Sequence, residues 1–176
     1  IRTSKLHVER NPRPKRFNLR VLEPMVMVVY TTDQQNRLLS RWVHYMVGTS
    51  FKDGSYLNVM YNRRFEWLDV PFRIQRDVTI PVGTYRYHDL NLSYITNPSS
   101  RVYGRAGYAP QTFFDGQRTD ANAMLGVRAT SRVATEVEYR RNDVDLPWGA
   151  FVANLGTFRL NMAVSPRMTL AVLSQY

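Results

Sequence analysis

Strict alternation of side-chain type between residues 133 and 164 constrains the fold more than any other feature of this chain. In VATEVEYR (133–140), the even-numbered positions include Glu136, Glu138 and Arg140, and mainly apolar residues occupy the odd-numbered positions. Successive residues of a β-strand point to opposite faces, so this pattern predicts a strand with one apolar and one polar face. The pattern returns from Val152 to Val164. We therefore expect two long strands joined by a loop.

The alternation recurs along the whole chain, between turn-forming clusters rich in Gly, Pro, Asn, Asp and Ser. The expected strands span residues 3–10, 17–32, 37–50, 55–68, 84–97, 101–114, 119–130, 133–142, 150–164 and 167–176. Pro24 is expected to mark a bulge or an edge, and the phase of the alternation changes near Asp89. No helical periodicity is present. The sequence predicts an all-β meander of about ten antiparallel strands.

Composition narrows the class of protein. At 176 residues, the chain is expected to be one domain, 1–176, or part of one, trimmed at both ends. No run of about 18 apolar residues exists, which excludes a transmembrane helix but leaves membrane-crossing strands open. The absence of cysteine excludes disulfides and thiolate metal sites. The formal charge of +10 would suit a nucleic-acid partner, but the basic residues are scattered through every strand, so no such partner is expected.

The lengths of the expected connections alternate. One set is short, at 52–54, 98–100, 131–132 and 165–166, with 11–16 somewhat longer. The other set contains longer loops at 69–83, 115–118 and 143–149, and a tight turn at 33–36. Short turns on one side and long loops on the other are typical of outer-membrane barrels, whose short turns face the periplasm. Most expected strands also have the ten or so residues needed to cross a bilayer.

Aromatic residues gather near the ends of the expected long loops. They are Tyr30, Phe65, Trp67, Tyr85, Tyr87, Phe113, Phe114, Tyr139, Trp148 and Phe151. Such positions suit an interfacial girdle at the level of the lipid headgroups. A soluble β-sandwich is the alternative, and it would place its aromatic residues at mid-strand. We therefore predict an antiparallel up-and-down transmembrane β-barrel of the outer-membrane type, with these strands forming part of a larger barrel.

Four stretches resemble one family of barrels. These are NRRFEWLDVPFRI (62–74), IPVGTYRY (80–87), YRRNDVDLPWGAF (139–151) and RLNMAVSPRMTLAVLSQY (159–176). They are similar to the C-terminal barrel of an uncharacterised outer-membrane family, whose members usually carry an N-terminal domain resembling carbohydrate-binding modules. That domain has no counterpart in these residues, and the family barrel continues past the position of Tyr176. The resemblance implies a fold and a compartment, the bacterial outer membrane, but no activity.

The polar parity of the strands carries charges that need a wet environment. The candidate lumen-lining residues are Arg105, Arg128, Glu136, Glu138, Arg140 and Arg159. An arginine facing lipid at mid-depth costs about 2–4 kcal/mol, so these residues are expected to face the lumen. Ion pairing across neighbouring strands is expected for most of them, although surplus arginine lining an anion-favouring pore is the alternative. The apolar parity, namely Val133, Val137, Tyr139, Leu160, Met162, Leu170 and Val172, is expected to contact lipid.

No catalytic or metal motif stands out. His7, His44 and His88 lie on separate strands, and nothing in their spacing places one beside a serine. Asn142, Asp143 and Asp145, with Pro147, form a loop motif that could offer oxygen ligands to calcium. These residue types more often open turns by bonding their own backbone, and we prefer that interpretation. We expect no enzyme activity, no metal and no cofactor.

These observations support three functional hypotheses. The first is an outer-membrane barrel that acts as a pore or as an anchor for a periplasmic binding domain, with anions preferred if it conducts. The second is a non-conducting structural subunit of an envelope assembly, which docks partners through its outer loops. The third and weakest is a hydrolase at the outer rim. Membrane lipid is the expected partner, and other envelope proteins could pair with the strands at 3–10 and 167–176, which we expect to have open edges.

Overall fold

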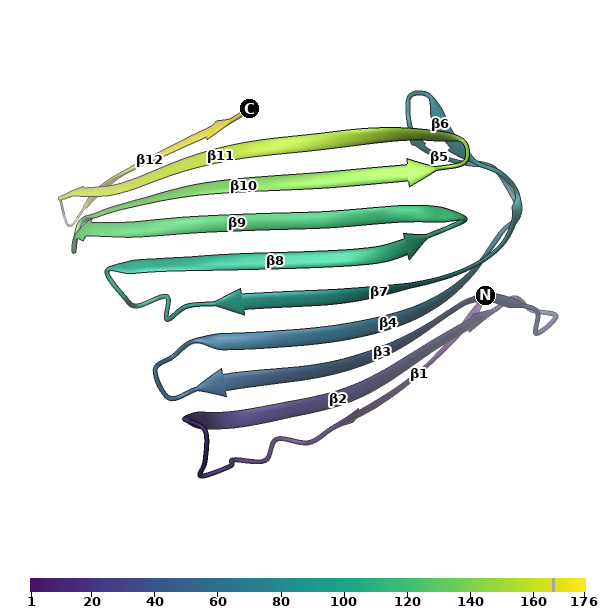
Figure 1. The fold of residues 1–176 in the computed structure, drawn as a ribbon, viewed down its shortest axis with the longest axis horizontal. Helices are drawn as coiled ribbons and strands as arrows, with labels where there is room; N and C mark the ends of the chain where they lie inside the picture. The colour runs from purple at the N-terminus through teal and green to yellow at the C-terminus, as the bar shows by residue number, and fades with distance from the viewer. Residues whose placement is uncertain (166) are drawn as a thin grey trace.

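Ten strands form one continuous antiparallel sheet in the computed structural model, which describes residues 1–165 and 167–176 (Figure 1). Sheet order follows chain order, β1-β2-β3-β4-β7-β8-β9-β10-β11-β12, so the predicted meander is confirmed. The strands are β1 (Arg2–Glu9), β2 (Leu19–Thr32), β3 (Leu38–Phe51), β4 (Tyr56–Leu68), β7 (Gly83–Ile95), β8 (Val102–Phe113), β9 (Gly116–Thr130), β10 (Val133–Leu146), β11 (Gly149–Ser165) and β12 (Met168–Gln175). Within the described ranges there is no helix long and apolar enough to cross a membrane.

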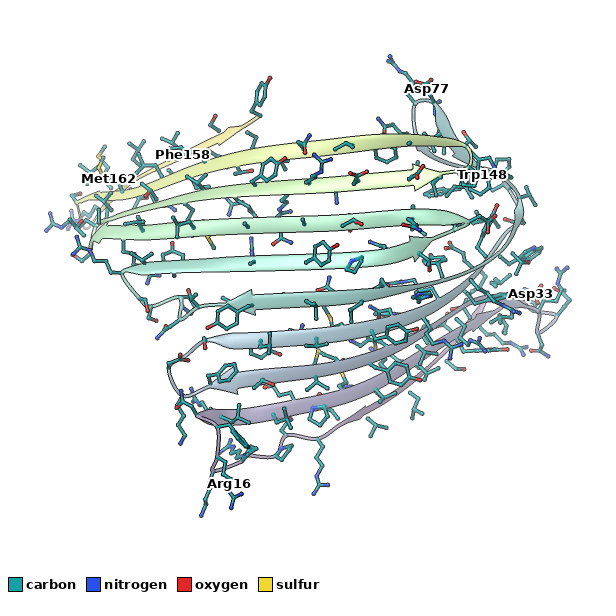
Figure 2. All side chains as sticks on the ribbon, viewed as in Figure 1. Arg16, Asp33, Asp77, Trp148, Phe158 and Met162 are labelled. Atoms are coloured by element: carbon teal, nitrogen blue, oxygen red, sulfur yellow. The ribbon has the colours of Figure 1, made fainter. Side chains whose placement is uncertain are left out.

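The register separates the two predicted faces. Glu136 is paired with Arg159 across β10 and β11, and Val137 with Phe158. Directly paired residues share a face, which defines a polar face containing Glu136 and an apolar face containing Val137. All seven residues expected on the apolar parity lie on the apolar face, namely Val133, Val137, Tyr139, Leu160, Met162, Leu170 and Val172. Figure 2 labels Phe158 and Met162 of that face along β11.

Neither a change of phase near Asp89 nor a bulge at Pro24 is present in the sheet. The β4–β7 register runs without a shift from Tyr56 to Leu68, so the expected change of phase near Asp89 is wrong. The physical reason is that Tyr85 and Tyr87 belong to the polar face together with Asp89. Pro24 causes no bulge, because it pairs in register with Val47 of β3. The expected alternative, an edge, holds locally, because the β1–β2 ladder ends at Glu9 and Met25 and Pro24 lies just beyond it. There the Pro24 carbonyl accepts the N–H of Arg10 at 3.1 Å.

The connections differ most from expectation. β10 and β11 are joined by residues 147–148 and β8 and β9 by 114–115, so the long loops expected at 143–149 and 115–118 are wrong. The polar residues within 143–149 and 115–118 are of types that form turns, but most of them pair with the neighbouring strand and so extend the sheet. The longest connection between the described strands is 69–82, and it contains a hairpin of β5 (Phe72–Gln75) and β6 (Val78–Ile80). We call the end of the sheet with this connection the hairpin end. The connection 10–18, at the opposite end of the sheet, is the next in length. The turn expected at Ser165 and Pro166 includes Pro166, which lies outside the described residues.

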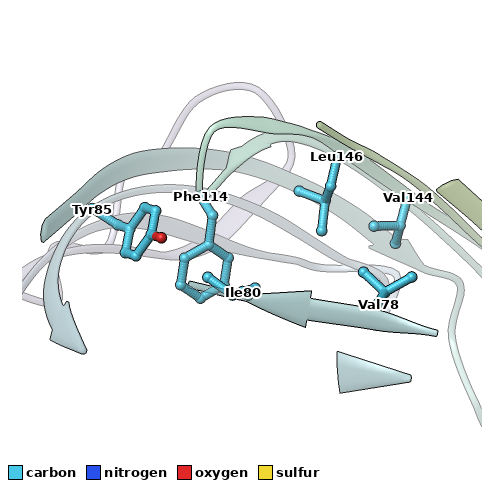
Figure 3. Packing of buried hydrophobic residues seen from close by; sticks show 6 residues of the cluster. All are labelled: Val78, Ile80, Tyr85, Phe114, Val144 and Leu146. Atoms are coloured by element: carbon cyan, nitrogen blue, oxygen red, sulfur yellow. The ribbon is translucent and has the colours of Figure 1, made fainter. Parts of the chain in front are cut away.

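The most deeply buried residues lie at the hairpin end, under β5 and β6. Figure 3 shows the cluster, made of Val78, Ile80, Tyr85, Phe114, Val144 and Leu146. Tyr87, Phe113, Trp148 and Phe151 pack against it. Two aromatic residues of the cluster and these four therefore form a packed core instead of belonging to the expected girdle. The reason is that those within strands point to the polar face. Tyr30, Phe65, Trp67 and Tyr139 do have the parity of the apolar face.

The sheet has two open edges. β1 and β12 stand at opposite ends of the strand order and are not paired with each other in the described part of the chain, as expected. The sheet is curved but is not closed into a barrel (Figure 1). Both edge strands run for eight residues. Each leaves a row of backbone donors and acceptors free to pair with a further strand.

Candidate functional site: the polar face of the sheet

All six candidate lumen-lining residues lie on the polar face, on four neighbouring strands. Arg105 is on β8, Arg128 on β9, Arg159 on β11, and the other three on β10. The register brings them together because Glu138 is opposite Met124, which is itself opposite Arg105. A similar row contains Glu136, Gly126 and Tyr103. Side chains on β8 and β10 can therefore meet above β9.

Glu138 is the centre of one ion-pair group. Glu138 is buried, with 7% of its surface exposed. Oε1 accepts a hydrogen bond from Nη2 of Arg105 at 2.7 Å and from Nε of Arg140 at 2.9 Å. Two guanidinium groups thus share one carboxylate. Charge-assisted bonds of this length satisfy the buried carboxylate and tie β8 to β10.

Glu136 is the centre of a second group. Its Oε1 accepts the Tyr103 hydroxyl at 2.8 Å, and its Oε2 lies 3.8 Å from Nη1 of Arg159. The guanidinium of Arg128 lies over the Tyr103 ring, 4.9 Å from its centroid. Five of the six candidates therefore take part in ion pairs, and Arg128 makes a cation–π contact instead.

A glycine makes the Tyr103 contact possible. A Cβ atom at Gly126 would overlap the Tyr103 ring, which crosses β9 at this point. The same arrangement occurs on β2, β3 and β4, where the Tyr56 hydroxyl reaches Glu23 at 2.9 Å above Gly48. In both places the glutamate is directly paired with the glycine. The sequence reasoning missed this repeat, although glycine at a polar-face position within a strand was an available signal.

A second polar group on the same face was also missed. Asn62 Oδ1 accepts from Nε1 of Trp42 at 2.7 Å and lies 2.6 Å from Nδ1 of His44, while its Nδ2 donates to Asp89 at 2.6 Å. Arg64 Nε completes the chain at 3.4 Å from Asp89. Because an amide oxygen only accepts, Nδ1 of His44 carries the proton. Matching polar parity on β3, β4 and β7 was the signal for this group.

The loop motif is not a loop. Asn142, Asp143 and Asp145 lie within β10, and only Pro147 lies in the turn. Asn142 points to the polar face, where its Nδ2 donates to Asp120 at 2.6 Å. Asp143 points to the apolar face and pairs with Arg141 at 3.0 Å. The preferred turn interpretation is therefore wrong, and the residues do not converge on one calcium position. No group of three or more potential metal ligands occurs among the described residues.

The three histidines are not brought together. His44 belongs to the buried group above, whereas His7 of β1 lies 3.4 Å from Glu9. His88 lies on the apolar face, where its Nδ1 is 3.3 Å from the Thr112 hydroxyl. None of them hydrogen-bonds to a serine within residues 1–165 and 167–176. The arrangement therefore lends no geometric support to a Ser/His/acid site.

What the polar face offers is a wall of fixed charges and hydrogen-bonding groups. A depression of ≈ 320 Å³ adjoins the Asn62 group and is lined in part by Arg64, Asp89, Gln111, Arg118 and Asp120. Asp120 accepts hydrogen bonds from Gln111 and Arg118 there. Such a surface can contact water and small polar solutes.

Comparison of the chain with protein-family models, curated proteins and solved structures found no match.

Proposed function

We propose that this chain forms the wall of an outer-membrane β-barrel, with the apolar face toward lipid and the polar face toward the lumen. The observation that carries the proposal is the uncovered apolar face. Its exposed side chains cross all ten strands and include Leu6, Val26, Val47, Tyr61, Leu92, Tyr108, Leu125, Val137, Phe158 and Leu170. Val137 and Leu125, at mid-strand, are each 57% exposed.

The size of this face argues against a soluble monomer. At about 4.8 Å per strand and 3.4 Å per residue, the apolar band is roughly 40 Å wide and 20 Å tall. That exceeds the largest apolar patch of a typical soluble monomer, about 300–600 Å². In one sheet of a soluble sandwich, the apolar face is buried and the charged face is exposed to water. In this sheet the apolar face is exposed, and the buried charged groups lie on the polar face. Lipid hydrocarbon is the cover that suits such a band.

Strand length supports a bilayer crossing. β2, β3 and β10 have 14 residues and β11 has 17. A tilted transmembrane strand needs about 9–11. In hydrocarbon, the free backbone groups of β1 and β12 would each cost several kcal/mol. The proposal therefore includes further strands pairing with both edges, from this polypeptide or from another envelope protein.

Membrane insertion is tested by refolding the full-length polypeptide that contains these strands, together with any envelope protein that pairs with β1 or β12, in the presence of phospholipid vesicles. We expect it to float with the vesicles, to gain protection from protease, and to migrate differently on gels before and after boiling. Protein that stays in solution as a monodisperse species under the same conditions would contradict the proposal.

We further propose that the barrel acts as a pore for small polar solutes or as an anchor for a periplasmic domain. On β8 to β11 the polar face carries five arginines, the four candidates and Arg118, against the carboxylates of Glu136, Glu138 and Asp120, and this local excess raises the anion concentration beside these strands. The remaining strands carry more carboxylates than basic residues on that face, namely Glu9, Glu23, Glu66 and Asp89 against Lys5 and Arg64, so the preference rests on β8 to β11. In planar bilayers with a salt gradient, the reversal potential should therefore show anion preference. Clear cation preference would contradict this assignment of the polar face.

A non-conducting structural subunit is the second candidate. The ion pairs on the polar face and the β5–β6 hairpin packed on that face favour it, because both would fill a narrow lumen. Inserted protein that produces no conductance steps would support this candidate over the pore.

A further inference from the structure

Arginines also occur on the apolar face, where they form a compact group near the hairpin end. The register places Arg41, Phe65 and Arg86 in one row across β3, β4 and β7. Arg63 and His88 are paired in the neighbouring row. We call Arg41, Arg63, Arg86 and His88 the basic cluster. Its residues come from three adjacent strands and all four are exposed.

The basic cluster has no acidic partner. Arg41, Arg63 and Arg86 form no ion pair in the part of the chain that the structure describes. The register gives no Asp or Glu an apolar-face position on β2, β3, β4, β7 or β8. Arg86 lies over the Phe65 ring, 5.8 Å from its centroid. The guanidinium groups are thus free to bind an anion from outside the chain.

A depression marks the place where that anion would sit. It has a volume of ≈ 300 Å³ and is lined by Arg41, Val43, Arg63, Arg86 and His88 of the apolar face, together with Arg64 and Tyr87, whose parity is that of the polar face. Neighbouring strands lie about 4.8 Å apart, so Arg41 and Arg86 start about 10 Å apart on either side of β4. Long arginine side chains can converge across that distance on one group. Guanidinium matches the geometry of phosphate oxygens, with two parallel hydrogen bonds from each arginine.

The neighbouring residues indicate what carries the phosphate. One row farther from the hairpin end, Tyr45, Tyr61 and Leu90 are paired across the same strands. The next row is Val47, Val59 and Leu92. The basic cluster therefore lies where the apolar band begins. Arginine on a lipid-facing surface costs only about 0–1 kcal/mol at this level, compared with 2–4 kcal/mol at mid-depth.

The geometry points to a binding site for a phosphorylated membrane lipid, with its phosphate in the basic cluster and its acyl chains along the rows from Tyr45 to Leu92. This inference rests on the proposed membrane function. It assigns the hairpin end to a bilayer surface rich in phosphorylated lipid, and it explains why the arginines here have no acidic partners. Free phosphate shares the headgroup chemistry but lacks the apolar contacts, so it should bind weakly.

The test compares lipid retention by variants of the folded protein in detergent, measured by native mass spectrometry with lipid A as the probe. The test variant is Arg41→Gln, Arg63→Gln, Arg86→Gln. The matched control is Arg101→Gln, Arg132→Gln, Arg167→Gln, which removes equal charge from turns at the opposite end of the sheet. We expect the test variant to bind lipid A at least about tenfold more weakly, because several charge-assisted bonds are lost, and the control to bind like the wild type.

Three further results decide the inference. Lipid A stripped of its phosphates should bind the wild type as weakly as lipid A binds the test variant, and excess inorganic phosphate should fail to displace lipid A. Equal binding by the test and control variants would overturn the inference, as would full displacement by inorganic phosphate. If the triple variant does not fold, Arg63→Gln alone should show a smaller loss in the same direction, and no loss would be equally negative. Flotation with phosphatidylcholine vesicles reports insertion separately, so protein that inserts but ignores lipid phosphate overturns this inference alone.

Discussion

Arginines on the two faces of this sheet have different surroundings. On the polar face, Arg105 and Arg140 both contact Glu138, at 2.7 and 2.9 Å. On the apolar face, Arg41, Arg63 and Arg86 have no carboxylate on their own or adjoining strands at that face. The difference shows that arginine on the polar face holds neighbouring strands together through ion pairs, whereas these arginines on the apolar face are available to bind an anion from outside the chain. The predictions below test this contrast between the faces.

The largest effect is expected from a charge placed in the middle of the apolar band. Val137→Arg should lower the free energy of unfolding in phospholipid vesicles by about 2–4 kcal/mol, because in the proposed barrel the guanidinium would face hydrocarbon. Asn161→Arg is the matched control, since Asn161 is an exposed residue on the polar face of the neighbouring strand, opposite Ala134. Its loss should stay below about 1 kcal/mol if the polar face borders water, as proposed. Urea titration measures both, and equal losses would show that the faces do not differ.

The next effect concerns the close packing of the polar face. Gly126→Ala should reduce the unfolding free energy by about 1–3 kcal/mol, because the new methyl group overlaps the Tyr103 ring. Gly156→Ala on the apolar face is the control, since its Cβ would meet only Tyr176, at 3.8 Å. Combining Gly126→Ala with Tyr103→Ala should give less than the sum of the single losses, because they share one contact. Strict additivity would argue against the packing described.

A smaller effect is expected at the shared carboxylate. Glu138→Gln leaves Arg105 and Arg140 without a counter-charge and should reduce stability by about 1–2 kcal/mol, less than a fully buried pair because both arginines are partly exposed. Asp143→Asn is the control, since its pair with Arg141 on the apolar face is exposed, and it should cost under about 0.5 kcal/mol. Chemical unfolding at neutral pH measures the loss of stability in both variants. Similar losses would show that the two ion pairs do not differ.

The smallest effect should come from a carboxylate that belongs to neither face. Hydrogen bonds from the Ser55 hydroxyl and backbone N–H hold the pKa of Asp53 below its ordinary value of 3.8 in the turn at 52–55. The ionised form therefore adds stability above that value, and the contribution is lost as pH falls through the lowered pKa of the folded state. Asp53→Ala should be slightly less stable than the wild type at neutral pH and equal to it in strong acid. Unfolding midpoints over a pH series test this, and a gap that widens in acid would contradict it.

Strand positions and faces were predictable because they depend on local alternation. Ten expected strands correspond to the ten strands of the sheet, and Glu136, Glu138 and Arg159 lie opposite in parity to Val137 and Leu160. The lengths of the connections were not predictable in the same way. Asn142, Asp143 and Asp145 have the composition of a turn, but cross-strand partners such as Asp120 keep Asn142 in the ladder. Residue type alone does not say whether such a partner is within reach.

By itself, the sequence determined the all-β class, the order of the strands and the side of the sheet on which each side chain lies, because an extended backbone alternates its side chains whatever it pairs with. Tertiary structure alone decided which side chains meet. Tyr56 with Glu23, Tyr103 with Glu136 and Arg105 with Glu138 are each 33 residues apart in the chain. Each of these contacts spans an intervening strand, so it depends on the register of two ladders. The aromatic core under β5 and β6 formed for the same reason: it needed the long connection to fold back over the polar face.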